Sequence, residues 1–151
     1  MPIRSDALDQ DIEQTHQWLD DVATYLELDD RSAAYQALSS VLIALREHIG
    51  ADHAAHLAGQ MPLLIRGAFY DGPEAAGLAS REVGESTFLD KVRQAGAGRL
   101  AVPPEAAASA VFRTLAERMD APIVDEIAAL FATEMGQVRE SGAQQRAHLR
   151  H

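Results

Sequence analysis

A chain of 151 residues, 47% of them hydrophobic, can bury enough apolar surface to fold as one domain without a disulfide or a metal. Its lack of cysteine excludes a disulfide framework, a thiol nucleophile and a thiolate metal site. The net charge of −10 is concentrated in residues 1–30, which hold nine acidic residues and one basic residue. This segment would repel a nucleic-acid backbone, so direct binding to nucleic acid is not expected.

Neither a signal peptide nor a membrane span is expected. The first residues lack the apolar run of a signal peptide, and the apolar stretches elsewhere are only a few residues long, whereas a membrane-spanning helix needs about 20 apolar residues. These features predict a cytoplasmic protein that makes no contact with a membrane.

The fold class is predicted to be all-α, because apolar residues recur at helical spacing and no run of five or more residues alternates as a half-buried strand requires. The first helix should run from about Ser5 to Leu26, with an acidic outer face. Its apolar stripe consists of Leu8, Ile12, Leu19, Val22 and Leu26. A second helix should span residues 31–49, with a cap from Asp29 and Asp30 and a stop at Gly50. Its stripe consists of Tyr35, Leu38, Val41, Leu42, Leu45 and Ile49.

A third helix should start near Asp52 and continue the apolar pattern through Leu57, Met61, Leu64, Ile65 and Ala68. Pro62 lies inside it and cannot donate a backbone N–H, so we expect a kink or a break near Gln60. Residues 71–84 contain three glycines and one proline and are predicted to connect two halves of the chain. Three more helices are expected. The first spans residues 85–94, the second runs from Pro103 and Pro104 to Met119, and the third starts at Asp120 and precedes a polar tail at residues 141–151. The last of them carries the stripe Ile123, Ile127, Leu130, Phe131, Met135 and Val138.

A shift of the sequence by 70 residues aligns its two halves without a gap. The aligned pairs are apolar, as in Trp18 with Phe88, Leu45 with Leu115, and Leu57 with Ile127. We therefore predict one domain of two tandem three-helix repeats, at about residues 5–70 and 85–140, packed into a six-helix bundle. A globin-like arrangement of the same helices is also compatible with the sequence. The halves differ, since Pro62 aligns with Ala132.

The first repeat carries a specific pattern of residues. It comprises Ala34, Tyr35, Ala37, Leu38, Val41, Leu42, Leu45 and Arg46, then Ala55-His56-Leu57, then Gln60-Met61-Pro62-x-Leu64-Ile65-Arg66-Gly67-x-Phe69-Tyr70-x-Gly72. On these residues the chain resembles the bacterial domain-of-unknown-function family numbered 2267 (DUF2267). The resemblance implies a tandem, all-helical fold over nearly the whole chain and implies no activity. The second half departs from the pattern, because it lacks the proline and the arginine–glycine pair after it.

Two histidines of the third helix are candidate metal ligands. His53 and His56 stand at positions i and i+3, which can place two imidazoles on one ion, with His48 and Asp52 nearby as further ligands. The pair lacks the i, i+4 spacing and the glutamate of H-E-x-x-H. The simpler interpretation is that His56 packs at a helix interface while His53 is solvated. We therefore expect neither a metal nor another cofactor.

A candidate ligand or partner site surrounds Pro62. It comprises His56, Gln60, Arg66 and Tyr70, with Asp71 beside them, and Arg66 would receive an anion or a partner's carboxylate. The alternative, which we favour, is that Arg66 pairs with the acidic first helix and ties the two elements together. If the chain has a site, we expect it in residues 48–72.

Catalysis is not expected, because the sequence contains no serine–histidine–acid motif and no glycine-rich phosphate loop. The leading hypothesis is a non-catalytic helical interaction module that binds a protein partner or itself. Its acidic helix, with Asp9, Glu13, Asp20, Asp21 and Glu27, is either a solvated face or a docking face for a basic protein. One alternative is a small-ligand or cofactor-binding protein with a pocket between the repeats. Another is a metal-dependent enzyme that uses His53 and His56.

Overall fold

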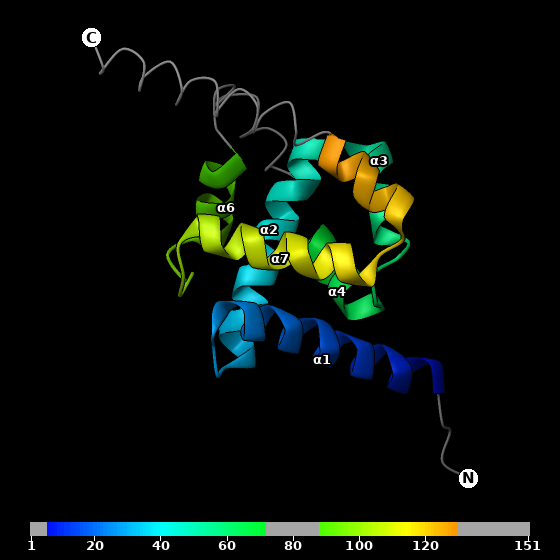
Figure 1. The fold of residues 1–151 in the computed structure, drawn as a ribbon, viewed down its shortest axis with the longest axis horizontal. Coiled ribbons are helices and arrows are strands. Elements are labelled where there is room, and N and C mark those ends of the chain that lie inside the picture. The colour runs from blue at the N-terminus through cyan, green and yellow to red at the C-terminus, as the bar shows by residue number, and fades with distance from the viewer. Residues whose placement is uncertain (1–5, 72–87, 130–151) are drawn as a thin grey trace.

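The structure, a computed structural model, describes residues 6–71 and 88–129 of the chain. Within these ranges it contains helices and no strand, which confirms the all-α class (Figure 1). The labelled helices are α1 (Asp6–Leu26), α2 (Arg31–Ile49), α3 (Ala51–Ala58), α4 (Leu63–Tyr70), α6 (Phe88–Gly96) and α7 (Pro104–Arg118). Residues 121–129 are helical as well.

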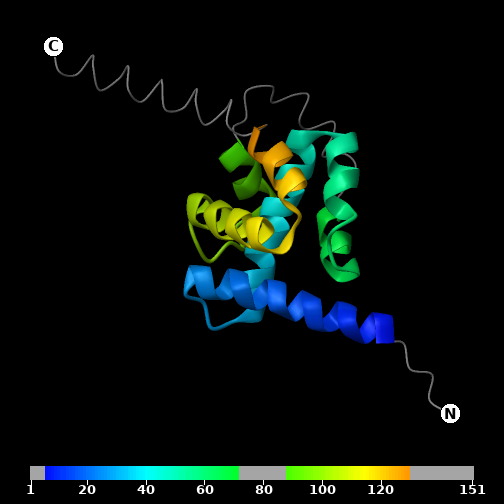
Figure 2. The same cartoon turned by 45° about the vertical axis from the view of Figure 1, so that its right-hand side comes forward.

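The central element of the fold is α2. It packs against α1, α3, α4, α6 and α7, and Figures 1 and 2 show α1 lying across one of its ends. The buried part of its predicted stripe consists of Leu38, Val41, Leu42, Leu45 and Ile49. Tyr35 belongs to the same predicted stripe, but its side chain is exposed, because Ala34 occupies the inward position of that turn.

Local signals set both ends of α2, as the sequence predicts. The side chain of Asp30 accepts a hydrogen bond of 2.8 Å from the N–H of Ser32, as an N-cap residue does. Gly50 adopts a φ of 85°, a left-handed conformation that residues with a side chain rarely adopt, and it separates α2 from α3.

The break predicted near Gln60 is present. Helix α3 ends at Ala58 and α4 begins at Leu63, with Gln60 in the turn between them. Pro62 has a φ of −54° and a ψ of 151°. Its ring fixes φ at a value that suits the start of a helix, whereas its ψ is still that of extended backbone. Figure 2 shows α3 and α4 one after the other along one side of the molecule.

Helix α1 is buried along only part of its length. Its buried residues are Thr15, Trp18, Leu19, Val22 and Ala23. Leu8 and Ile12 continue this stripe but are exposed, so the expectation that they join the core is wrong. The buried residues of α1 begin only at Thr15, and the start of the helix projects beyond the other labelled helices (Figures 1 and 2). Leu64 is exposed for a related reason, since Ile65 and Ala68 fill the inward positions of α4.

The second half of the chain supplies α6, α7 and the helical residues 121–129. Helix α6 ends at Gly96, two residues beyond the predicted end at residue 94, and α7 starts at Pro104, where proline suits a first turn. The ring of Phe88 on α6 stacks on that of Phe112 on α7, with centroids 5.6 Å apart.

Some sequence predictions fall outside the described residues. They are the connector after Asp71, the start of the helix predicted at residues 85–94, and everything from Leu130 onward. The organisation into two repeats therefore stays a prediction.

Candidate functional site

Arg66 stabilises the break between α3 and α4. Its Nε donates a hydrogen bond of 2.9 Å to the carbonyl oxygen of Ala58, and its Nη2 donates one of 3.3 Å to the carbonyl oxygen of Met61. Ala58 ends α3, and the end of a helix leaves its last carbonyls without an intrahelical donor. The expected ion pair between Arg66 and the first helix is therefore wrong: the guanidinium caps α3 instead.

Gln60 joins the turn after α3 to the second half of the chain. Its Nε2 donates a hydrogen bond of 2.9 Å to Oδ2 of Asp120, and the backbone N–H of Asp120 donates one of 2.8 Å to Oε1 of Gln60. The carbonyl oxygen of Asp120 in turn accepts hydrogen bonds of 3.1 Å from the N–H groups of Ile123 and Val124. The amide of Gln60 therefore fixes the start of the helix at residues 121–129.

His53 and His56 both face one carboxylate from the second half. Nδ1 of His53 contacts Oε1 of Glu126, and Nδ1 of His56 lies 3.9 Å from Oε2 of the same residue. The side chain of His56 is 69% exposed and that of His53 is 37% exposed, which reverses the expectation of a packed His56 and a solvated His53. Over residues 6–71 and 88–129, no group of three or more histidine or acidic side chains could hold a metal ion.

Tyr70 is exposed at the end of α4, and its ring packs edge-on against that of Phe69 at 5.2 Å. Beside it, Nη1 of Arg46 donates hydrogen bonds to the carbonyl oxygens of Phe69 and Asp71, at 3.0 and 2.9 Å. The four residues of the expected ligand site, His56, Gln60, Arg66 and Tyr70, thus have separate partners. A ligand site that uses them together stays a prediction.

The second half of the acidic helix is tied to its neighbours by ion pairs. Oδ1 and Oδ2 of Asp20 accept hydrogen bonds of 2.9 and 3.1 Å from Arg31, which lowers the pKa of Asp20 and raises that of Arg31. Oδ2 of Asp21 accepts one of 2.7 Å from Nε of Arg118. Arg118 also donates to Oε1 of Gln17, at 3.3 Å. These acids hold α1 against α2 and α7.

Tyr25 adds a polar contact between α1 and α7. Its hydroxyl donates a hydrogen bond to Glu117, which raises the pKa of Tyr25 and lowers that of Glu117. The guanidinium of Arg113 lies 4.1 Å from the centroid of the Tyr25 ring. Sequence reasoning missed this group, because Tyr25 lies more than 80 residues from Arg113 and Glu117 along the chain.

Asp11 connects the first half of α1 to α4. The N–H groups of Leu63 and Leu64 donate hydrogen bonds to its two carboxylate oxygens, the second at 3.2 Å. These are N–H groups of the first turn of α4, where Pro62 provides no side-chain cap. A carboxylate from another helix therefore caps α4.

Large hydrophobic side chains lie exposed around this cap. Leu8, Ile12, Leu63 and Leu64 are between 40% and 57% exposed, and we call these four residues the α1–α4 face. Tyr70 follows Leu63 by seven residues and so lies on the same side of α4. Of the six large hydrophobic residues that are exposed in the described ranges, only Tyr35 lies on another helix.

The composition of α4 indicates this surface, although the spacing of its apolar residues does not. Helix α4 has the sequence LLIRGAFY, in which Arg66 is the only charged residue. A helix that is apolar all round must be covered on more than one side or leave apolar side chains in water. Ile65, Ala68 and Phe69 are buried, so the exposed side carries Leu63 and Leu64.

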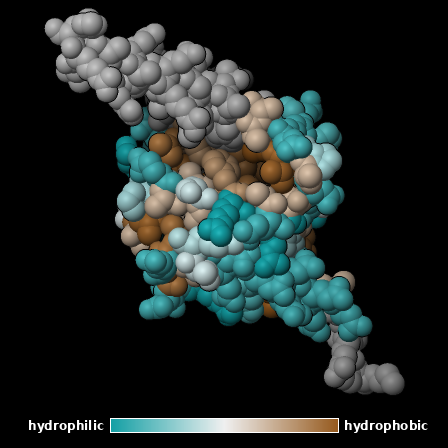
Figure 3. Space-filling view, viewed as in Figure 1, coloured by the Kyte–Doolittle hydropathy of each residue, from teal (hydrophilic) through white to brown (hydrophobic). Residues whose placement is uncertain are grey.

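Apolar side chains also gather between α7 and residues 121–129 in Figure 3. These residues belong to the core, because Phe112, Ile123 and Val124 are half-buried and pack against it. We therefore assign no site there. No helix in the described ranges is both long enough and apolar enough to cross a membrane.

Comparison with known proteins identifies the family of the chain. No curated protein matches it. The family model described as "Uncharacterized conserved protein (DUF2267)" matches residues 15–138, which include all of α2, α3, α4, α6 and α7. This match covers well over half of the 151 residues and agrees with the all-helical fold. The chain therefore belongs to the DUF2267 family.

Proposed function

We propose that this protein is a non-catalytic interaction module of the cytoplasm and that the α1–α4 face is its contact surface for another protein. One observation carries the proposal: in the described ranges, five of the six exposed large hydrophobic residues lie on α1 or α4. Covering an exposed leucine contributes about 1.5–3 kcal/mol when burial is complete. Exposed apolar side chains that gather on two packed helices, as on α1 and α4, suit an interaction site, whereas single exposed hydrophobic residues are common on any surface.

Contacts within the chain support the surface rigidly. The carboxylate of Asp11 caps α4 from α1, and the guanidinium of Arg66 caps α3 across the break. Ile65 and Phe69 anchor α4 in the core. A surface held in this way loses little conformational entropy on binding, which favours a specific complex.

Site-specific photo-crosslinking in the source cells tests the proposal. A photoreactive residue replaces Leu64 in one variant and Tyr35, which is exposed on α2, in the control. We expect Leu64 to form an adduct with a distinct protein that the Tyr35 variant does not form. Loss of that adduct in a Leu63→Gln, Ile12→Gln background would support the α1–α4 face as the contact surface. The same adducts from both positions, or none from Leu64, would overturn the proposal.

A further inference from the structure

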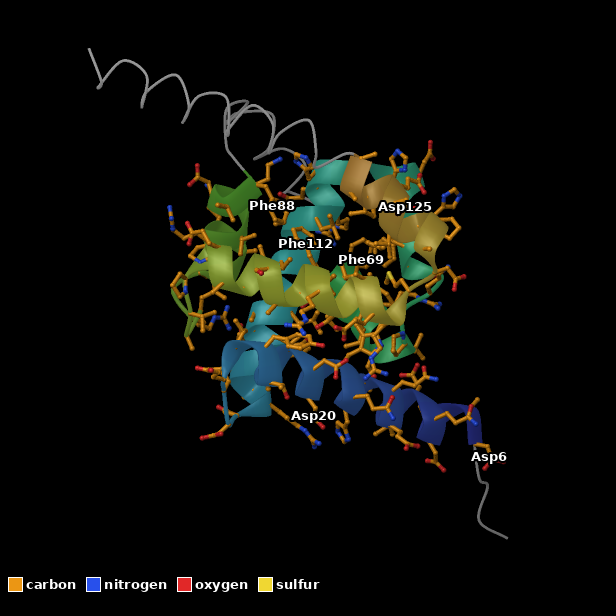
Figure 4. All side chains as sticks on the ribbon, in the orientation of Figure 1. Asp6, Asp20, Phe69, Phe88, Phe112 and Asp125 are labelled. Carbon is orange, nitrogen blue, oxygen red and sulfur yellow. The ribbon has the colours of Figure 1, made fainter. Side chains whose placement is uncertain are left out.

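A row of acidic residues runs beside the apolar residues of α1. Asp6, Asp9 and Glu13 are spaced by three and four residues, so they lie along one side of the helix. Asp9 follows Leu8 and Glu13 follows Ile12, which places the acidic row about 100° around the helix from the apolar row. Figure 3 shows the side of α1 turned to the viewer as mostly hydrophilic, and Figure 4 shows Asp6 and Asp20 along its outer edge.

The acidic residues in the two halves of α1 differ in whether they form ion pairs within the described residues. Asp20 and Asp21 form ion pairs with Arg31 and Arg118. Over residues 6–71 and 88–129, no cationic side chain lies within ion-pair distance of Asp6, Asp9 or Glu13. The acids beside the α1–α4 face are therefore available to a charged partner, whereas those further along the helix hold the fold together.

This charge distribution argues against a second copy of the chain as the partner that covers the α1–α4 face. Helix α1 contains no lysine or arginine, and the one cation of α4, Arg66, is bound to backbone carbonyls. Two copies joined through this surface would bring their acidic rows together without a compensating charge. An anionic membrane would be repelled for the same reason.

We propose that the α1–α4 face binds a cationic amphipathic helix of a partner protein, an inference that rests on the proposed function. Apolar residues of the partner helix, spaced by three and four, cover Leu8, Ile12, Leu63 and Leu64. Lysine or arginine residues on its flank meet Asp9 and Glu13. Gly67 follows Leu63 by one helical turn, and a Cβ placed there meets nothing within 4 Å, so a helix can approach α4 closely at this point.

Two synthetic peptides of about 18 residues, long enough for five helical turns, test the charge requirement. Both carry leucines on one side, and they differ only in lysine or glutamate on the flank. Their binding to the full chain is measured by fluorescence anisotropy. We expect the lysine peptide to bind at least about tenfold more tightly, and the difference to shrink as salt rises to about 0.5 M, where surface charges are screened. Equal binding of the two peptides would overturn the inference.

Two double variants that remove the same net charge show which acidic residues contact the lysine peptide. Asp9→Asn with Glu13→Gln should weaken binding of the lysine peptide about tenfold, the scale of two interfacial charge contacts. Asp52→Asn with Glu105→Gln removes the same net charge at exposed positions on α3 and α7 and should leave binding within about twofold. Equal losses in both double variants would show a net-charge effect only and would contradict the proposal.

Two further measurements exclude other occupants. Light scattering should show that the chain does not form a dimer through this face, that is, a dimer that the double variant Leu63→Gln with Leu64→Gln would convert to monomers. Vesicles of phosphatidylglycerol should not bind the chain. Either result in the opposite sense would overturn the partner assigned here.

The failure of this inference is distinguishable from that of the proposed function. If the protein crosslinked at Leu64 still binds Asp9→Asn with Glu13→Gln at full affinity, the interaction surface stands and the cationic partner does not. If Leu64 forms no specific adduct, the proposed function itself fails.

Discussion

Asp11 caps a helix that begins far along the chain: its Oδ2 accepts a hydrogen bond of 3.2 Å from the backbone N–H of Leu64, 53 residues away. Pro62 sets the φ angle for the start of α4 but offers no side-chain acceptor. The carboxylate of Asp11 fills that role and also places a negative charge at the positive end of the α4 dipole. One residue thus joins α1 to α4 and sets the shape of the α1–α4 face.

Replacement of Asp11 by alanine should lower the free energy of unfolding by about 1 kcal/mol, because the first N–H groups of α4 lose their acceptor. Urea denaturation measures the change. Glu13→Ala, on the exposed side of the same helix, is the control and should change stability by less than about 0.5 kcal/mol. Equal effects of the two substitutions would show that the cap contributes nothing.

Gln60 and Asp120 should stabilise the fold as a pair. Gln60→Ala removes both hydrogen bonds to Asp120 and should cost about 1 kcal/mol, because the pair is exposed and water partly replaces it. In a double-mutant cycle with Asp120→Ala, we expect a coupling energy of at least about 0.5 kcal/mol. Additive losses would mean that the contact does not join the two halves.

Features set by neighbouring residues could be predicted from the sequence. The cap at Asp30, the stop at Gly50 and the break at Pro62 depend on the chemistry of single residues and their immediate neighbours, and all three are present. Contacts between distant residues could not be predicted in this way. His53 meets Glu126 across 73 residues, and periodicity indicates which side of a helix is apolar without naming its partner.

The candidate site shows the same division. Arg66 was a reasonable ion-pair partner for the acidic helix, but the break beside it left carbonyls that a guanidinium satisfies at closer range. Leu8 and Ile12 have the spacing of core residues, and spacing does not reveal where the core ends along α1. The surface could therefore not be predicted, because three of its four residues, Leu8, Ile12 and Leu64, belong to stripes that the sequence assigns to the interior.

The hydrogen bond from Tyr25 to Glu117 should make stability depend on pH in two windows. The pKa of Glu117 is lowered in the folded protein, so its contribution is complete above its ordinary value of 4.5 and is lost as the pH falls through the lowered pKa. The pKa of Tyr25 is raised, so its contribution is complete below its ordinary value of 10.0 and is lost as the pH rises through the raised pKa.

Tyr25→Phe isolates this contribution, since it removes the hydroxyl and keeps the ring under Arg113. We expect the difference in Tm between the wild-type protein and this variant to be largest between about pH 5 and pH 9 and to shrink on both sides. Tyr70→Phe, at an exposed tyrosine on α4, is the control and should give a difference that does not change with pH in the acidic window. A constant difference for Tyr25→Phe over the whole range would contradict the assignment.

Adjacent residues of α4 should separate stability from binding. Ile65 is completely buried, so Ile65→Ala leaves a cavity and should cost about 2–5 kcal/mol of the free energy of unfolding. Leu64 is half exposed, so Leu64→Ala should cost less than about 1 kcal/mol, while it weakens binding of the partner crosslinked at this face. Urea denaturation and anisotropy on the same two proteins check both expectations. If Leu64→Ala destabilises the fold as strongly as Ile65→Ala, Leu64 is a core residue and the α1–α4 face is not a free surface; if it changes neither property, the face has no part in binding.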